Sequence, residues 1–162
     1  METVNKKIIL IGNIGVGKTS LVTRFINNTF SENYLSTIGV KIDKKSIALN
    51  HINVNLLVWD IAGEANFTNI SKSYYLGAKG CVFVADCSRV NTFTDYKNQI
   101  NDLEKKYPDL KIIKVVNKID LLTESEIKKL KKQTLFDHYV SVKKGEFVHN
   151  IFKDIAKKVT DG

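Results

Sequence analysis

Residues 12–20 read GNIGVGKTS, directly after the apolar run IILI and directly before LVTRF. Gly12, Gly17, Lys18 and Thr19 match the pattern G-x-x-x-x-G-K-[ST]. In this pattern backbone N–H groups turn inward to hold phosphate oxygens, the lysine adds a point charge, and the hydroxyl binds Mg²⁺. A helix starting at Lys18 adds the positive end of its dipole. The stretch predicts a phosphate-binding loop between a strand and a helix, and a glycine-rich turn without a ligand is the alternative.

The rest of the chain alternates short apolar runs with longer polar segments of helical period. The apolar runs predict strands, four of them apolar enough to be covered on both faces, at 6–11, 54–60, 81–86, 111–117 and 138–142. The segments between them predict helices at 18–27, 68–76, 92–107, 124–135 and 144–159. Thr123 and Glu126 have the spacing of a capping box at the start of the fourth helix. Residues 40–60 predict an antiparallel hairpin that turns at Asn50 and His51.

This order of elements predicts an α/β fold, a P-loop domain with a mostly parallel six-stranded sheet, one antiparallel hairpin strand and helices on both faces. A chain of 162 residues, 43% of them hydrophobic, is long enough for one core and too short for two ordinary domains. We therefore expect one domain over residues 1–162.

Charge and cysteine content narrow the possible partners and the compartment. The net charge of +8 favours polyanions, which include nucleotides, nucleic acid, an acidic protein face and anionic lipid. Cys81 and Cys87 lie in or at the end of the apolar run CVFVADC, so we expect buried thiols in a reducing compartment. The sequence has no signal-peptide pattern and no apolar run long enough to span a membrane. We expect a soluble, cytoplasmic protein.

The stretch NKID at Asn117 to Asp120 follows the apolar run KIIKVV and bears on which nucleotide binds. A carboxylate at Asp120 can accept hydrogen bonds from the N1–H and the exocyclic amino group of guanine, a pair that adenine lacks. The stretch also stands at the carboxyl end of a predicted parallel strand, where open α/β sheets bind ligands. It favours a guanine nucleotide over ATP.

Six stretches in order, KKIILIGNIGVGKTSLVTRF, STIGV, WDIAGE, YYLGAKG, NKID and VSVKKG, resemble the Ras superfamily of small GTPases, most closely the Rab family. The resemblance covers nearly the whole chain and implies a switch in membrane-trafficking signalling that binds GTP or GDP with Mg²⁺ and hydrolyses GTP. It implies Mg²⁺ binding through Thr19, Thr37 and Asp60. It implies nucleotide binding by Gly12, Gly15, Val16, Gly17, Lys18, Thr19, Ser20, Phe30, Thr37, Gly63, Asn117, Lys118, Asp120, Ser141, Val142 and Lys143.

Two of the four residues expected at the reacting phosphate, Ile14, Lys18, Gly63 and Glu64, depart from the family. Glu64 stands where the family has a glutamine that orients water; a carboxylate cannot donate, and it adds charge near phosphate. Branched Ile14 replaces a small residue where the arginine of an activating protein would enter. We expect slow hydrolysis. The alternatives are that Glu64 acts as a base, that Ile14 points away, or that the protein holds nucleotide without meaningful hydrolysis.

The resemblance also implies effector, exchange and activating proteins that bind the switch regions and a patch at Ile42, Trp59 and Tyr74, with ordinary packing as the alternative for the patch. The lysine-rich run at 127–133 predicts a solvated helix face, with lipid or nucleic acid as the alternative; we expect no nucleic-acid partner. We expect a monomer. The sequence ends at KKVTDG without the family's prenylated cysteine, so peripheral binding at the cytosolic face of an internal membrane would need a tail outside this sequence or a partner.

Overall fold

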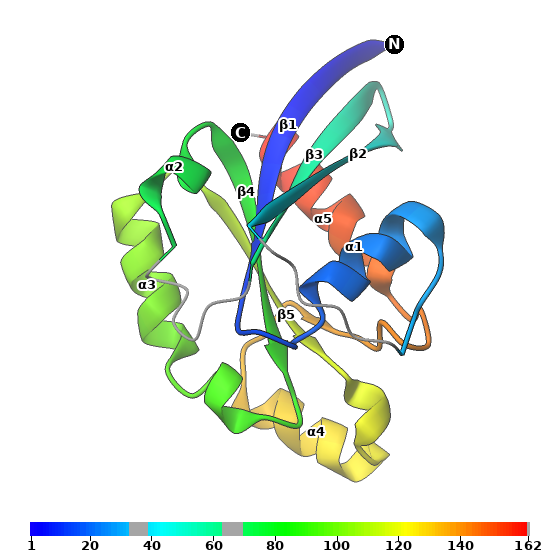
Figure 1. Ribbon diagram of the computed structural model, residues 1–162, viewed down its shortest axis with the longest axis vertical. Helices are drawn as coiled ribbons and strands as arrows, with labels where there is room; N and C mark the ends of the chain where they lie inside the picture. Colours follow the sequence, from blue (N-terminus) through cyan, green and yellow to red (C-terminus); the bar gives the residue numbers. More distant parts are fainter. Residues whose placement is uncertain (33–38, 63–69, 162) are drawn as a thin grey trace.

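The computed structural model describes residues 1–32, 39–62 and 70–161. Its strands form one sheet in the order β2-β3-β1-β4-β5-β6 (Figure 1). All neighbours pair in parallel except β2, which pairs antiparallel with β3. The strands are β1 (Glu2–Ile11), β2 (Val40–Leu49), β3 (Ile52–Ile61), β4 (Ala78–Asp86), β5 (Lys111–Asn117) and β6 (His138–Tyr139). This is the mostly parallel sheet with one antiparallel hairpin strand that the sequence predicts.

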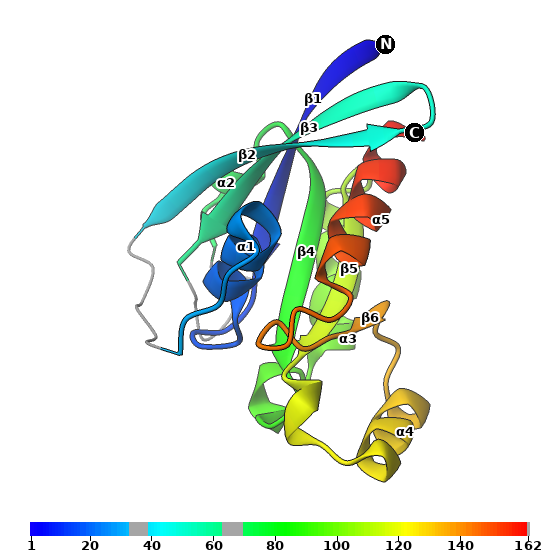
Figure 2. The same ribbon diagram turned by 90° about the vertical axis from the view of Figure 1, so that its right-hand side faces the viewer.

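Helices cover both faces of the sheet. Figures 1 and 2 show α1 and α5 on one face, α2 and α3 on the other, and α4 beside the β5–β6 end. The helices are α1 (Lys18–Asn27), α2 (Lys72–Tyr75), α3 (Tyr96–Lys106), α4 (Glu124–Gln133) and α5 (Val148–Thr160), with short 3₁₀ helices η2 (Val90–Thr92) and η3 (Ile119–Leu121). Among the described residues, none of these helices has both the length and the apolar content needed to cross a bilayer.

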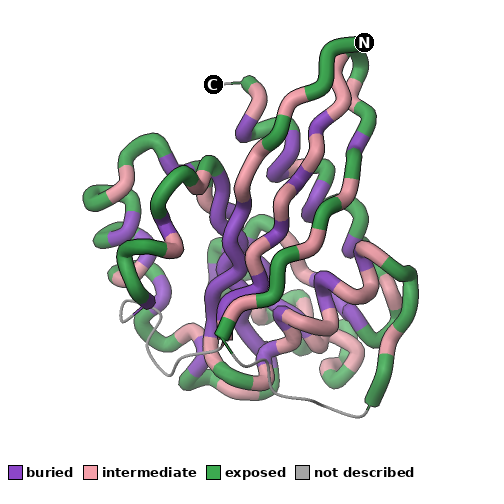
Figure 3. Tube along the Cα trace, turned by 45° about the horizontal axis from the view of Figure 1, so that its top comes forward, coloured by how far each residue is buried: buried purple, intermediate pink, exposed green. Residues whose placement is uncertain are grey.

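The core has two halves because successive residues of a strand point to opposite faces of the sheet. On β1, Ile8 and Leu10 pack into the half under α1 and α5, whereas Ile9 and Ile11 pack into the half under α2 and α3. All four side chains are fully buried, and Figure 3 shows buried backbone concentrated in the central strands. The apolar runs that are buried on both faces are therefore the strands that hold the two helical layers together.

Several sequence predictions are confirmed in detail. The first helix has the predicted bounds, and the hairpin turns at Asn50 and His51. Thr123 accepts a hydrogen bond from the Glu126 N–H while the Glu126 carboxylate accepts one from the Thr123 N–H, which is the predicted capping box. Both cysteines are free and buried.

Other predicted boundaries are wrong because local side-chain contacts redirect the chain. The strand predicted at 138–142 ends at Tyr139, since Ser141 and Val142 leave the sheet to contact Asp120, after β5, and Asn117, at its end. The helix predicted from 144 begins at Val148, after Phe147 in a left-handed conformation. Other differences are earlier starts of β1, at Glu2, and of β4, at Ala78, a shorter α2 and α4, and a break between η2 and α3. The first two residues of the helix predicted at 68–76 lie outside the described residues.

The strand predicted at 54–60 is also less buried than its apolar sequence suggests. Its residues alternate between buried and half-buried instead of being buried on both faces. On the half-buried side, the Lys7 ammonium lies 3.8 Å from the centre of the Trp59 ring. Part of this face is therefore covered by a long cationic side chain.

Candidate nucleotide-binding site

The loop between β1 and α1 passes so close to its neighbours that two of its positions accept only glycine. A Cβ on Gly12 would lie 2.3 Å from the Val84 carbonyl oxygen, and a Cβ on Gly17 would lie 2.4 Å from the Asn117 amide nitrogen. Both glycines also have positive φ, +148° and +107°. The first and second glycines of the motif are thus explained by contacts with β4 and with the end of β5.

Lys18 lies inside this loop and is only 6% exposed. Its ammonium group donates to the carbonyl oxygens of Gly12 at 2.9 Å and Asn13 at 3.2 Å. Burial lowers the pKa of Lys18 to about 8; the nearby Asp60 carboxylate opposes this shift, and the Arg89 guanidinium adds to it. Burial disfavours the charged form of Lys18, and the negative charge of a phosphate group would stabilise it.

The first turn of α1 is also suited to an anion. Gly17 is its N-cap, and within the described residues no side chain caps the helix and no acidic residue occupies the first turn. The N–H groups at the start of a helix have no partners within the helix, and the helix dipole favours negative charge there. The loop, Lys18 and the start of α1 therefore all favour an anion at the same place.

Thr19 and Asp60 place two side-chain oxygen atoms that could bind a metal beside the loop. The Thr19 hydroxyl donates to an Asp60 carboxylate oxygen at 2.6 Å, and Asp60, near the end of β3, is 1% exposed. Mg²⁺ prefers oxygen ligands and is commonly held by one or two protein groups together with substrate phosphates. These two residues therefore fit a magnesium ion. Thr37, the third predicted metal residue, lies outside the described residues.

Asn117 joins the phosphate loop to the segment after β6. Its side-chain amide donates to the Val16 carbonyl at 3.0 Å, and its amide oxygen accepts from the Val142 N–H at 3.0 Å. Ser141 donates to the Asp120 carboxylate at 2.7 Å. Residues far apart in the sequence therefore meet at the carboxyl ends of β1 and β5, as the sequence motifs predict.

These segments enclose a cavity of about 490 Å³, which is within the usual size of small-molecule sites. Its wall includes apolar, cationic and acidic side chains from the phosphate loop, from the segment after α1 and from the segments after β5 and β6. The residues that line it are Ile14, Gly15, Gly17, Ser20, Phe30, Ser31, Glu32, Arg89, Asn117, Lys118, Asp120, Leu121 and Lys143. Lys143 pairs with Glu32 at 3.0 Å, and this contact raises the pKa of Lys143.

Both arginines of the chain contact this site, although neither is among the predicted site residues. Arg24 on α1 donates to the carbonyl oxygens of Val142 at 3.0 Å and Lys143 at 2.7 Å. Arg89, just before η2, donates to the Ile14 carbonyl at 2.7 Å. In a chain with 25 basic residues, the rarity of arginine is the only sequence signal that sets these two apart. Each arginine holds backbone carbonyls of one nucleotide loop.

Asp86, at the end of β4, is a further site residue that the motifs do not reveal. Its carboxylate lies 2.8 Å from the Lys118 ammonium and accepts from the Ser88 hydroxyl at 2.6 Å. Burial raises the pKa of Asp86, but the hydrogen bonds from Lys118 and Ser88 outweigh burial and hold the pKa below its usual value. Lys118 also donates to the Gly15 carbonyl at 2.9 Å. Asp86 therefore fixes a cation that in turn holds the phosphate loop.

The predicted catalytic and partner residues are described only in part. Gly63 and Glu64 lie outside the described residues. Ile14 lines the cavity with 54% of its surface exposed. Ile42 is directly opposite Trp59 in the β2–β3 ladder, and Trp59 and Tyr74 pack against the same half of the core.

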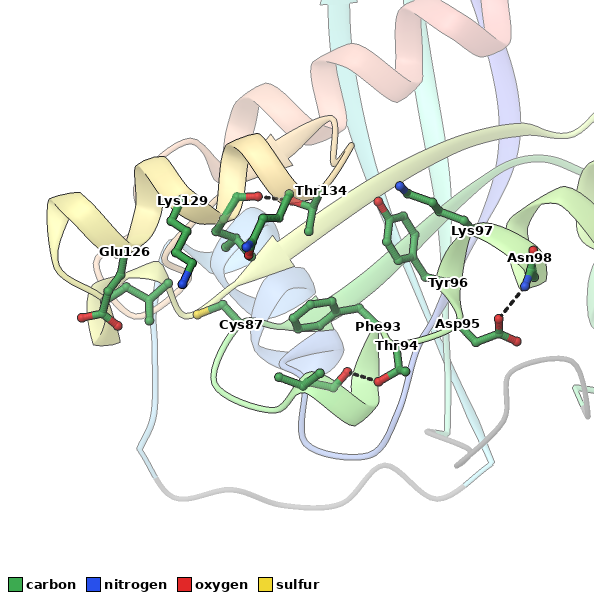
Figure 4. Close-up of a pocket in the computed structure, with 14 residues that line it drawn as sticks. Cys87, Phe93, Thr94, Asp95, Tyr96, Lys97, Asn98, Glu126, Lys129 and Thr134 are labelled. Carbon is green, nitrogen blue, oxygen red and sulfur yellow. Dashed lines mark hydrogen bonds between the residues drawn. The ribbon is translucent and has the colours of Figure 1, made fainter.

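A wider cavity of about 730 Å³ lies between α3 and α4 (Figure 4). Cys87 and Phe93 lie between the two helices, and the Cys87 thiol donates to the Lys118 carbonyl at 3.1 Å. At the rim, the Asn98 amide donates to Asp95 at 2.8 Å. None of the residues that line this cavity belongs to the phosphate loop, whereas loop residues line the smaller one. The smaller cavity is therefore the candidate nucleotide site.

Comparison with known proteins agrees with this geometry. A model of the Ras family matches residues 7–161. Ras-related protein Rab-18-B of Danio rerio is 34% identical over 160 residues, covering 94% of this chain and 78% of the relative. Ras-related protein Rab-1 of Theileria parva is 35% identical over 164 residues, covering 96% and 74%. Ras-related protein RABE1d of Arabidopsis thaliana is 33% identical over 161 residues, covering 94% and 74%. The chain belongs to the Ras family, and it is a Rab-like small GTPase.

Proposed function

We propose that this protein binds GTP and GDP together with Mg²⁺, hydrolyses GTP slowly, and acts as a switch in membrane trafficking. The observation that carries the proposal is the meeting of the phosphate loop, Asn117 to Asp120 and Ser141 to Lys143 around one cavity. The first segment offers donors for phosphates, and Asp120 offers acceptors for guanine. Family membership supports the same reading.

The residues of the site have distinct parts in the reaction. Lys18 and the loop N–H groups offset the charge of the β- and γ-phosphates, which is where charge develops during in-line attack by water. Thr19 and Asp60 would hold Mg²⁺, which when bound neutralises phosphate charge. Asn117 keeps the base-binding segment and the phosphate loop in register through its two hydrogen bonds. The site thus positions phosphates and base from one rigid frame.

Two side chains, Glu64 and Ile14, favour slow hydrolysis. Glu64, which stands where the family has glutamine, cannot donate to the transition state when ionised and would add a negative charge near phosphate. Ile14 has a branched side chain at the cavity wall, where an arginine from an activating protein would enter. Both features favour a long-lived GTP-bound form.

Single-turnover hydrolysis of bound GTP tests this proposal. We expect Glu64→Gln to speed hydrolysis about tenfold or more, because one transition-state donor is commonly worth at least that much. Ile14→Gly should restore the response to an activating protein, and the double variant should combine both effects. Lys18→Ala is the control that removes phosphate binding. Hydrolysis that none of the variants accelerates would contradict the proposed bias, and bound GTP that persists for hours in every variant would indicate a nucleotide-holding scaffold.

We also propose that effector, exchange and activating proteins contact Ile42, Trp59 and Tyr74 in a monomeric protein. Ile42 is 51% exposed and lies directly opposite Trp59 in the β2–β3 ladder, so a partner that contacts Ile42 would also reach the edge of Trp59. A Rab-like protein would use such a surface at the cytosolic face of internal membranes. Binding of a partner that depends on bound GTP, and that Ile42→Asp weakens, would support this surface.

A further inference from the structure

Arg89 contacts the phosphate loop from outside it. Its side chain is 40% exposed and lines the same cavity as Gly15, Ser20 and Lys118. One terminal nitrogen donates to the Ile14 carbonyl at 2.7 Å, and the other lies 3.3 Å from the position that a Cβ on Gly15 would take. The guanidinium is therefore beside the middle of the loop, at the mouth of the cavity.

Protein groups hold this guanidinium in place. Its Nε lies 3.6 Å from an Asp86 carboxylate oxygen, and Asp86 is itself buried at the end of β4. The hydrogen bond to Ile14 fixes a second point of the planar group. Arg89 is thus preorganised, and little side-chain entropy remains to be lost when an anion arrives.

Three cationic side chains lie around the middle of the phosphate loop. Lys18 lies within the loop, Lys118 donates to the Gly15 carbonyl, and Arg89 donates to the Ile14 carbonyl from outside the loop. The Asp86 carboxylate contacts two of these cations, Arg89 and Lys118. A guanidinium has five N–H donors, so a bond to Ile14 leaves donors for a second acceptor. Phosphate oxygens match its geometry well.

We propose that Arg89 binds the diphosphate of the bound nucleotide and slows its release. This inference rests on the proposed guanine-nucleotide function. The loop surrounds the α- and β-phosphates, so a cation beside Gly15 faces groups that GDP and GTP share. An interaction with groups that both nucleotides carry is made in the GDP-bound and in the GTP-bound form, so it slows the release of both. Arg89 therefore sets the residence time of either nucleotide.

The test compares nucleotide release and hydrolysis in the full chain. Release of fluorescent GDP and GTP analogues is measured for the wild type, Arg89→Gln, Arg89→Lys and Lys97→Gln. We expect Arg89→Gln to release both nucleotides about tenfold faster, as loss of one charged hydrogen bond at a partly exposed site implies. Single-turnover hydrolysis of bound GTP is measured on the same proteins, so that an effect on release can be told from an effect on the chemical step. Lys97→Gln removes an equal charge from exposed α3 and should release nucleotide at the wild-type rate.

Arg89→Lys separates charge from packing. It keeps a cation near the diphosphate, so its release rates should fall between those of the wild type and Arg89→Gln, even where both variants lower the unfolding temperature of the nucleotide-free protein. Wild-type release rates in Arg89→Gln, or a change confined to hydrolysis, would overturn the role of Arg89. A wild-type protein that binds neither GDP nor GTP would instead overturn the proposed function.

Discussion

Phe147 combines two features that are unfavourable in a folded chain. Its φ is 64°, in the left-handed region, and 58% of its surface is exposed. A side chain with a Cβ costs about 1–2 kcal/mol in this conformation, whereas asparagine tolerates it better. The residue precedes α5 directly, so its backbone sets where that helix begins.

We therefore predict that Phe147→Asn stabilises the protein by about 1 kcal/mol. The free energy of unfolding in urea measures the change. Phe147→Ala removes the exposed ring but keeps the strained Cβ, so it should not reproduce the gain. Equal stabilisation by both variants would show that the ring, and not the backbone, is the source of the cost.

Single residues differ in how well the sequence reveals them. Gly12, Gly17 and Lys18 are predictable because one loop geometry requires them at fixed spacing, and the structure shows the contacts that enforce it. Arg24 and Arg89 are not predictable in the same way. Their partners are backbone carbonyls, which every residue has, so the partner leaves no mark on the sequence.

At the scale of elements, α5 approaches the sheet closely where it crosses β4. A Cβ on Gly80 would lie 2.9 Å from the Cδ1 and Cγ1 atoms of Ile155 and 3.0 Å from the Cγ2 atom of Ile8. These distances are too short for carbon atoms, so the helix or the side chains would have to shift. Glycine at this position allows α5 to pack directly on the strand.

Gly80→Ala is expected to destabilise the protein by about 1–3 kcal/mol through overpacking. Ile155→Val removes one of the colliding atoms and alone costs about 0.5–1.5 kcal/mol. Because the two changes share a contact, the double variant should lose less stability than the sum, by about 1 kcal/mol. Urea unfolding of all four proteins measures this coupling, and strict additivity would contradict the contact.

Element boundaries were predictable where the signal is local. The capping box at Thr123 and the glycine-lysine start of α1 fix helix starts by side-chain and backbone chemistry within a few residues. The end of β6 depends instead on Asn117 and Asp120, which attract Val142 and Ser141 across the fold. A hydrophobic pattern such as HYVSV cannot show that its second half leaves the sheet for a distant partner.

At the scale of the whole molecule, the ion pair between the buried Asp86 carboxylate and the partly exposed Lys118 links stability to pH. The folded pKa of Asp86 lies below the ordinary value of about 4. Near that pH the unfolded chain therefore binds more protons than the folded protein. The stabilisation from Asp86 is present above about pH 4 and is lost as the pH falls through the folded pKa.

Asp86→Asn should accordingly cost about 2 kcal/mol at pH 7, where it removes charged hydrogen bonds from Lys118 and Ser88. The difference from the wild type should shrink below about pH 4, because the wild-type carboxylate then becomes neutral too. Urea unfolding at pH 7 and at low pH measures this. Asp109→Asn, at an exposed position, is the control, and a pH-independent difference for Asp86→Asn would contradict the assignment.

The whole fold follows from the sequence because its main signals agree. Apolar runs buried on both faces specify parallel strands, the hairpin turn specifies the one antiparallel pair, and the phosphate loop fixes the first strand and helix. Such agreement between levels is typical of sequences that specify one structure. The cavity between α3 and α4 had no such signal, because its wall combines residues without a shared motif.

The central claim is that the cavity beside the phosphate loop selects guanine nucleotides. Titration of the nucleotide-free protein with GDP and with ADP, each with Mg²⁺, tests it most directly. Two charged hydrogen bonds to Asp120 are worth about 3–6 kcal/mol together, so GDP should bind at least about a hundredfold more tightly than ADP. Asp120→Ala should abolish that preference. Equal affinity for the two nucleotides in the wild type, or binding of neither, would contradict the account.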